Sequence, residues 1–482
     1  MNYLKLTFVA LAGWLTIAVA EAQHRDLDLQ LPDIGDSAGS VVSPTEENRV
    51  GKAFFQRLRQ NGSLIEDPEI VDFITYLGNR IASQTQRGEA NFHFFVVDNN
   101  TVNAFALPGG YVGIHTGLFR ILEREGQMAA VVAHEIAHVT QRHMARAYSM
   151  AEKMSLPTAV ALLSAIILAT QDAQVGSAAL YGTVAGTAQA QINFTRGNEE
   201  EADRVGQRLL DKARYPAVYM AEGFKKLLDA HRGYGEGPPE YLRTHPLTLN
   251  RVAQAQARAE ALPQRPDEID LNYQLARARL MVMSSTPGDA LKSYGAAVTA
   301  ADGDAALVDR YGLALAQFAA GRVDPARTTV LALVNEHPAI RAFATADARL
   351  ALKSGDYDHA LERSASALDL WPGDYALTMI RSRAFAATGH HEKAIDLLRP
   401  LARRRAERPD IHELLGNQYR AIGNDAEAYM SWAEMHYLDG RIETAIQQLS
   451  QAQRIAGNQY HVAARIDARL KVFELEKERE KD

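Results

Sequence analysis

One stretch of sequence decides the fold of the first half of the chain: Met128-Ala-Ala-Val-Val-Ala-His134-Glu135-Ile-Ala-His138. Its first six residues are apolar or good helix formers and contain no Gly or Pro, so the stretch predicts a buried helix. Residues four apart lie on the same side of a helix, so His134 and His138 can direct two imidazoles at one metal ion. Glu135 lies one position on, where it can reach a water molecule beside the metal. The pattern predicts a zinc site; the alternative is a pair of hydrogen-bonded core histidines.

A zinc site of this kind needs a third protein ligand. One class of such enzymes uses a His six residues after the second, but Met144 stands there, so that class is excluded. The chain has no cysteine, which excludes a thiolate ligand. An acid from a second helix is the alternative, and Asn198-Glu199-Glu200-Glu201-Ala202-Asp203 is such a segment. Spacing alone does not choose among three consecutive acids, and the start of a solvated helix has the same composition.

The two motifs together resemble peptidase family M48. The resemblance rests on the His134–His138 motif, on Glu199-x-x-Ala-Asp203, and on segments 103–112 and 244–246. It implies an α+β zincin-type, gluzincin-like domain that binds one Zn²⁺ per chain, with Glu199 as the third ligand and Glu135 as the catalytic base. Asp203, one helical turn after Glu199, can accept a hydrogen bond from a ligating histidine. An ordinary surface acid is the alternative for Asp203.

Two further histidines lie near these motifs. His245 precedes Pro246, which favours an extended or turn conformation. The resemblance implies that His245 can take the open zinc position and silence the enzyme, because a fourth protein ligand excludes the water that zinc activates. The alternative is an ordinary loop histidine. His143, five residues after His138, is interpreted as structural or exposed.

A short sheet is expected upstream of the motif helix. Strand-like patterns cover Asn91–Asp98, Asn103–Leu107 and Tyr111–His115, with Pro108-Gly-Gly110 as a turn. Enzymes of this class commonly bind extended peptide along a sheet edge. The predicted substrate-binding edge strand contains Asn103, Ala104, Phe105 and Ala106. An interior hairpin explains the same pattern equally well.

The second half of the chain repeats every 34 residues. Glycines recur at this spacing, and each is followed five positions later by an alanine: Gly321 and Ala326, Gly355 and Ala360, Gly389 and Ala394, Gly423 and Ala428. Gly ends one helix in a left-handed turn, and Ala lets the next helix approach closely. This period is typical of tetratricopeptide repeats. The pattern predicts an all-α solenoid whose concave face usually holds another protein.

The chain therefore divides into unlike parts. Residues 1–22 are expected to be a cleaved signal peptide, with Ala20-Glu-Ala22 as the cleavage site, and 23–44 a flexible lead-in. The metallopeptidase domain is assigned to 45–262 and the repeat domain to 267–482. The apolar run 156–190 has three interpretations: a buried helical hairpin, a lid over the cleft, or an interfacial membrane contact.

The net charge of the chain and the order of its predicted domains limit the classes of function that it can have. The formal net charge of -7 argues against nucleic-acid binding. A leader, an M48-like domain and repeats together resemble the periplasmic members of that family. This implies a periplasmic zinc endopeptidase for quality control of misassembled outer-membrane β-barrel proteins, which also assists their assembly. Expected partners are unfolded outer-membrane proteins and, through the repeats, the β-barrel assembly machinery. The alternative is a chaperone or scaffold with a latent protease.

Overall fold

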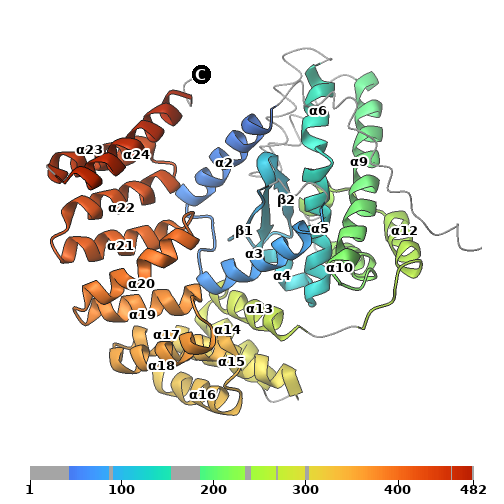
Figure 1. The fold of residues 1–482 in the computed structure, drawn as a ribbon. Helices are drawn as coiled ribbons and strands as arrows, with labels where there is room; N and C mark the ends of the chain where they lie inside the picture. The colour runs from blue at the N-terminus through green and yellow to red at the C-terminus, as the bar shows by residue number, and fades with distance from the viewer. Residues whose placement is uncertain are drawn as a thin grey trace, which may run out of the picture.

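The computed structural model of the 482-residue chain describes residues 43–85, 91–152, 185–233, 240–266, 270–298, 303–457 and 459–479. A mixed α/β domain lies beside a curved array of paired helices (Figure 1). The expected signal peptide 1–22, segment 23–42 and residues 156–184 of the apolar run lie outside these ranges. Residues 185–190 of that run belong to helix α9, Ala185–Lys212. Among the helices that the structure describes, none has the length and apolar character needed to cross a membrane.

The first domain contains a three-stranded sheet close to the predicted positions. Its strands are β1 (His93–Val97), β2 (Ala104–Leu107) and β3 (Tyr111–His115). The order is β1-β3-β2, with β1 parallel and β2 antiparallel to β3, so β2 lies at the edge of this sheet.

The turn η1 (Pro108–Gly110) joins β2 to β3 and depends on its glycines. Gly109 and Gly110 have φ angles of 77° and 86°, which L side chains rarely adopt. A Cβ atom on Gly109 would also lie 2.5 Å from the Cα of Asn48 in the neighbouring helix. The expected turn is therefore present and fixes the β2–β3 register.

Helices surround this sheet. They are α2 (Pro44–Gln60), α3 (Pro68–Ala82), α4 (Thr116–Ile121), α5 (Glu125–Thr140), α6 (His143–Glu152), α9, α10 (Tyr219–Gly233), α11 (Glu240–Thr244) and α12 (Leu249–Glu260). The predicted motif helix is α5, and it is buried from Glu125 to Ala137. Helices α3, α9 and α10 and strand β2 pack against it. The motif therefore lies in the hydrophobic core of the domain.

The helical array consists of hairpins, as the repeat predicts. Its helices are α13 (Leu271–Met283), α14 (Pro287–Val298), α15 (Gly303–Ala319), α16 (Val323–Glu336), α17 (Arg341–Lys353), α18 (Tyr357–Leu370), α19 (Tyr375–Ala387), α20 (His391–Arg404), α21 (Pro409–Ala421), α22 (Asp425–Leu438), α23 (Ile442–Ala456) and α24 (Tyr460–Arg479). The four periodic glycines have φ angles of 75° to 79°. The alanine that follows each of them has no exposed surface. Both physical expectations about the hairpins are thus confirmed.

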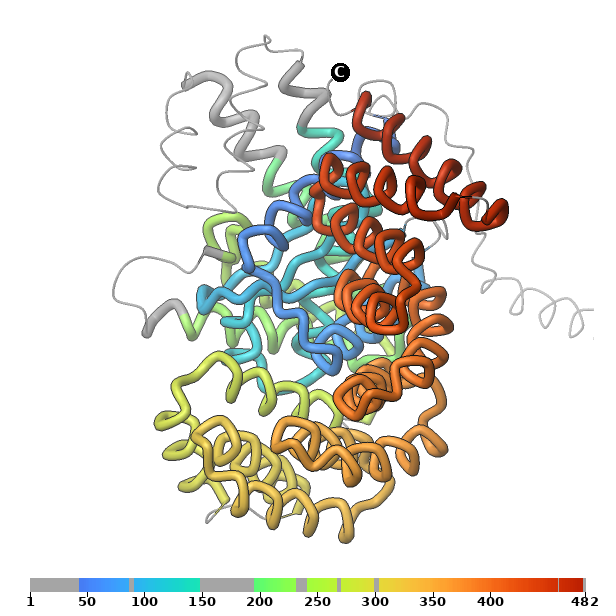
Figure 2. Tube along the Cα trace, turned by 90° about the vertical axis from the view of Figure 1, so that its left-hand side faces the viewer, coloured from blue at the N-terminus to red at the C-terminus, as the bar shows by residue number. Residues whose placement is uncertain are grey.

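Helix α13 joins the two parts. Tyr273 and Leu280 belong to the core of the first domain, whereas Leu275 and Val282 belong to the core of the array. One helix thus contributes to both cores, and the array begins as an extension of the first domain. From there it curves along one side of that domain (Figure 2).

A row of buried and partly buried ion pairs holds the array against α3 and the residues just before it. Asp67 caps α3, and its carboxylate also accepts hydrogen bonds of 2.9 and 2.6 Å from Arg279 of α13. Arg349 of α17 lies 2.6 Å from Glu69. Two further arginines of the array pair in the same way, Arg405 with Asp72 and Arg408 with Glu66. We call these four arginines the arginine clasp: Arg279, Arg349, Arg405 and Arg408. The face of the array that was expected to hold another protein therefore contacts its own first domain.

Candidate active site

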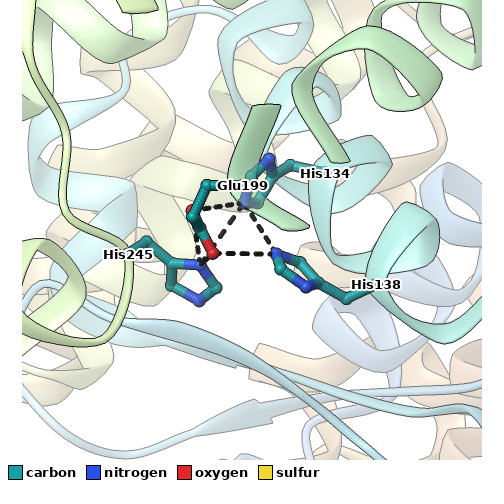
Figure 3. A group of neighbouring side chains, drawn as sticks. All are labelled: His134, His138, Glu199 and His245. Atoms are coloured by element: carbon teal, nitrogen blue, oxygen red, sulfur yellow. Dashed lines mark hydrogen bonds and ion pairs between the residues drawn. The ribbon is translucent and has the colours of Figure 1, made fainter. Parts of the chain in front are cut away.

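Four side chains meet at one point (Figure 3). Three were predicted to bind the metal, and the fourth was predicted to block the open metal position. His134 and His138 come from α5, Glu199 comes from α9, and His245 follows α11. One ligand atom from each lies within 4.8 Å of the others. His134, Glu199 and His245 are buried, and His138 is partly buried.

The spacing of these atoms fits a tetrahedral metal. Nε2 of His134 lies 3.0 Å from Nε2 of His138, and the Glu199 oxygens lie 3.5 and 3.4 Å from these two nitrogens. Nδ1 of His245 lies 3.3 Å from Nε2 of His134 and 3.1 Å from Oε1 of Glu199. Ligands about 2.0–2.1 Å from a tetrahedral zinc ion are about 3.3 Å apart. Two or three imidazoles and a carboxylate are also a donor set that suits zinc.

Close helix packing brings Glu199 to the histidines. Helix α9 crosses α5 at Gly206, where a Cβ atom would lie 3.0 Å from the carbonyl oxygen of Ala133. Ala202, one turn earlier, has no exposed surface. Small residues at these two positions let the α9 backbone approach the motif helix, so a carboxylate from α9 can reach the two imidazoles.

The charge around the cluster favours a divalent cation. Glu135, Glu199 and Asp203 are buried carboxylates, and one guanidinium, that of Arg251, contacts Asp203 and Glu199. With neutral imidazoles these four groups carry three negative charges and one positive charge, a sum of -2. Burial alone would lower the pKa of His134, but Asp203 and Glu199 raise it to about 10. The two carboxylates therefore favour positive charge at His134, whereas burial lowers the pKa of His138 to about 3.

Glu135 is a carboxylate buried beside the ligand cluster. It has no exposed surface, and neither of its oxygens has a hydrogen-bond partner among the described residues. Burial raises its pKa above the ordinary value. Unpaired buried carboxylates are rare in folded proteins unless a site needs them. This one is suited to accept a proton.

The outer nitrogens of the two motif histidines also have neighbours. Nδ1 of His134 lies 3.0 Å from Asp203, which is 1% exposed, so Asp203 is not the surface acid that one interpretation allowed. Nδ1 of His138 lies 2.8 Å from Nδ1 of His143, and Nε2 of His143 lies 3.1 Å from Glu201. His143 is buried rather than exposed.

Sequence reasoning missed Arg251 and the contact between His138 and His143. Helix α5 ends at Thr140, and Arg142 has a φ angle of 51°, so helical spacing does not predict the direction of His143. Arg251 lies 48 residues beyond Asp203, and no local pattern connects the two.

The predicted edge strand passes beside Glu135. Strand β2 packs against α5, and the backbone of Ala106 lies close enough to lower the pKa of Glu135, against the effect of burial. Asn103 precedes this strand and has no exposed surface. Its side-chain amide has no hydrogen-bond partner within the described part of the chain. Among the described strands, β2 thus has an unpaired edge and passes close to Glu135, and Asn103 at its start carries amide atoms without a partner.

Comparison with known proteins agrees with this geometry. The model of peptidase family M48 matches residues 74–259, and a tetratricopeptide-repeat model matches residues 351–417. The β-barrel assembly-enhancing protease of Escherichia coli K12 is 34% identical over 472 residues, which cover 97% of this chain and 96% of that protein. The chain belongs to peptidase family M48. It is therefore a metalloendopeptidase with a tetratricopeptide-repeat array.

Other M48 relatives match over different lengths. The β-barrel assembly-enhancing protease of Yersinia pestis is 33% identical and covers 98% of this chain and 96% of its own. The mitochondrial metalloendopeptidase OMA1 of Bos taurus is 31% identical over 173 residues, 34% of this chain and 32% of that protein. The long matches include the repeats.

Proposed function

We propose that this M48 peptidase is a zinc endopeptidase in which His134, His138 and Glu199 hold the metal and Glu135 is the general base. The observation that carries the proposal is the tetrahedral spacing of the donor atoms beside an unpaired, buried Glu135. A zinc ion bound there would polarise the scissile carbonyl and lower the pKa of the attacking water to about 7. Glu135 would take the proton from that water and return it to the leaving amine.

Substrate would bind along β2. The free edge of this strand can pair with an extended peptide, and the unpaired amide of Asn103 can hydrogen-bond to the peptide backbone. Because β2 packs on α5, a peptide on this edge would present its scissile bond next to Glu135. Asp203 would hold His134 in the orientation that metal binding requires.

His245 would keep the resting enzyme closed. Its Nδ1 lies among the other three donors, so it would complete the tetrahedron and leave no position for the attacking water. When Nδ1 is a ligand, the ring proton is on Nε2, which lies 3.6 Å from Oε1 of Glu135. One side chain would thus block the open position and face the general base. Cleavage requires His245 to move away.

The wider function follows from the relatives. We infer that the chain acts in the periplasm on misassembled outer-membrane β-barrel proteins, and that its repeats contact partner proteins, including the assembly machinery. The full-length match to proteins named β-barrel assembly-enhancing proteases supports this inference. A mainly scaffolding protein with a latent protease is the second candidate, and the position of His245 among the zinc ligands favours it.

A Glu135→Gln variant tests the catalytic proposal. It should retain about one zinc ion per chain but lose cleavage of an unfolded protein by about 100-fold or more, because proton transfer is lost. Glu199→Ala should lose the metal as well, and Glu200→Gln, a change at an exposed neighbouring acid, should change neither property. Full activity of Glu135→Gln would show that the assignment is wrong. Complementation of a deletion strain by Glu135→Gln would favour the scaffold.

A further inference from the structure

His138 contacts a chain of side chains that the proposed mechanism does not use. Nδ1 of His138 lies 2.8 Å from Nδ1 of His143, and Nε2 of His143 lies 3.1 Å from Oε2 of Glu201. Arg146 then donates a hydrogen bond of 2.6 Å to the same oxygen of Glu201. This series of contacts thus runs from the imidazole of His138 to Arg146, which is partly exposed.

The proton positions in this chain follow from metal binding, so they rest on the function proposed above. If Nε2 of His138 binds zinc, the ring proton is on Nδ1 and needs an acceptor. The nearest partner is Nδ1 of His143, which accepts only when that ring carries its own proton on Nε2. Glu201 is placed to accept a hydrogen bond from that second N–H group. Each of the two ring protons then faces an acceptor.

We propose that His143 and Glu201 are positioning residues that fix the ring orientation and tautomer of His138 for zinc binding. They act on His138 as Asp203 and Arg251 act on His134. Each ligating imidazole therefore has a neighbouring side chain at its Nδ1. A carboxylate in each group pairs in turn with an arginine: Asp203 with Arg251, and Glu201 with Arg146. Partners of this kind commonly change metal affinity by 10- to 100-fold.

The backbone between His138 and His143 directs the His143 ring toward His138. Helix α5 ends at Thr140, and Arg142 adopts a left-handed φ of 51°, which is uncommon for a residue with a side chain. The Arg142 side chain donates a hydrogen bond of 2.9 Å to Glu47 of α2. This break starts α6 at His143 and turns that ring back onto His138. An uninterrupted helix would place residues five apart on different faces.

The three consecutive acids of α9 have three different environments. Glu199 reaches the ligand cluster, Glu200 is exposed, and Glu201 contacts His143 and Arg146. Arg146 donates a hydrogen bond to Oε2 of Glu201, and the same oxygen lies 3.1 Å from Nε2 of His143, so Glu201 is placed to accept a hydrogen bond from that ring. The neighbour Glu200 provides a matched control for Glu201.

The test is zinc affinity, measured by competition with a chromogenic chelator. His143→Leu keeps volume but removes the acceptor, and it should weaken zinc binding by about 10- to 100-fold. His143→Asn places an amide oxygen near the position of Nδ1, and it should stay within about threefold of wild type, a difference of under about 1 kcal/mol. Glu201→Ala should weaken binding, whereas Glu200→Ala should not.

A spectroscopic measurement separates positioning from general stability. In the cobalt-substituted protein, His143→Leu should shift the visible absorption bands, and His143→Asn should restore them. Wild-type zinc affinity in both His143→Leu and Glu201→Ala would overturn the proposal, as would equal losses in His143→Leu and His143→Asn. If His143→Leu does not fold, Glu201→Ala decides the question. A wild-type protein that binds no zinc would instead refute the function proposed above.

Discussion

Arg251 and Asp203 form a buried bidentate ion pair, in which Nε and Nη2 of the arginine each lie 2.8 Å from a carboxylate oxygen. Nη1 of the same guanidinium lies 2.8 Å from the carbonyl oxygen of Pro246 and 3.0 Å from Glu199. One side chain therefore connects the segment that carries His245 to Asp203 and Glu199 of α9. The position of His245 and the charge at the metal site are physically coupled.

We expect Arg251→Met to destabilise the protein by about 3–5 kcal/mol, because the buried carboxylate of Asp203 would lose the guanidinium that pairs with it. Zinc affinity should also fall, since Asp203 would no longer be held next to His134. Chemical denaturation and chelator competition measure the two effects. Arg243→Met, at an exposed position on α11, should change stability by less than about 0.5 kcal/mol. Equal stabilities of the Arg251 and Arg243 variants would contradict the coupling.

His245→Ala should increase the rate of cleavage of an unfolded protein. If His245 occupies the open metal position in about nine-tenths of the resting enzyme, removing it gives about a tenfold increase in the cleavage rate. Zinc should also dissociate faster, because one of four donors is lost. Initial rates and chelator-driven metal release test both effects. Leu249→Ala, at a nearby exposed position on α12, is the control. A His245→Ala variant with an unchanged rate would rule out the closed resting state.

Features set by local spacing were predictable from the sequence. The two motif histidines are four residues apart on one helix, and the 34-residue period of Gly and Ala follows from the geometry of helix hairpins. The strands were predicted to within two residues. In this segment, runs of β-forming residues alternate with turn-forming residues such as glycine, so the ends of the strands are visible in the sequence. Each of these predictions concerns residues that are close in sequence.

Features set by long-range packing were not predictable in this way. Glu199 was singled out among three acids only by family resemblance, since its approach depends on α9 packing against α5 at Gly206. His143 depends on a left-handed backbone at Arg142, a residue type that rarely adopts it. The contact of the array with the first domain depends on charge pairs such as Arg279 with Asp67, 212 residues apart.

Arg279→Met should loosen the array from the first domain. Arg279 is 6% exposed and pairs with Asp67 and Glu69, so its loss leaves two buried carboxylates with less compensation and should cost about 3–5 kcal/mol. Limited proteolysis of segment 263–266 should become faster. Lys292→Met, at an exposed site on α14, is the control.

A double-mutant cycle with Asp67→Asn, which keeps the cap of α3, isolates the Arg279–Asp67 pair. A coupling energy near zero would show that the Arg279–Asp67 pair does not help to hold the two parts together.

Glu125 should make stability depend on pH. It lies 5% exposed at the start of α5, and Tyr215 donates a hydrogen bond to it. Burial and the nearby carboxylate of Asp270, the cap of α13, raise the pKa of Glu125 from 4.5 to about 8. Because the folded state binds this proton more tightly than the unfolded state, the stabilisation is complete below about pH 4.5 and is lost as pH rises through about 8.

A Glu125→Gln variant should therefore melt at a higher temperature than wild type at pH 9, and the two curves should converge near pH 5. The amide keeps a neutral group at this position at every pH, so the carboxylate never has to ionise in a buried site next to Asp270. Melting temperatures between pH 5 and pH 9 measure the difference. Glu123→Gln, at an exposed residue that pairs with Lys226, should follow the wild-type curve. Parallel curves for wild type and Glu125→Gln would show that Glu125 ionises without cost and would contradict the raised pKa of this carboxyl.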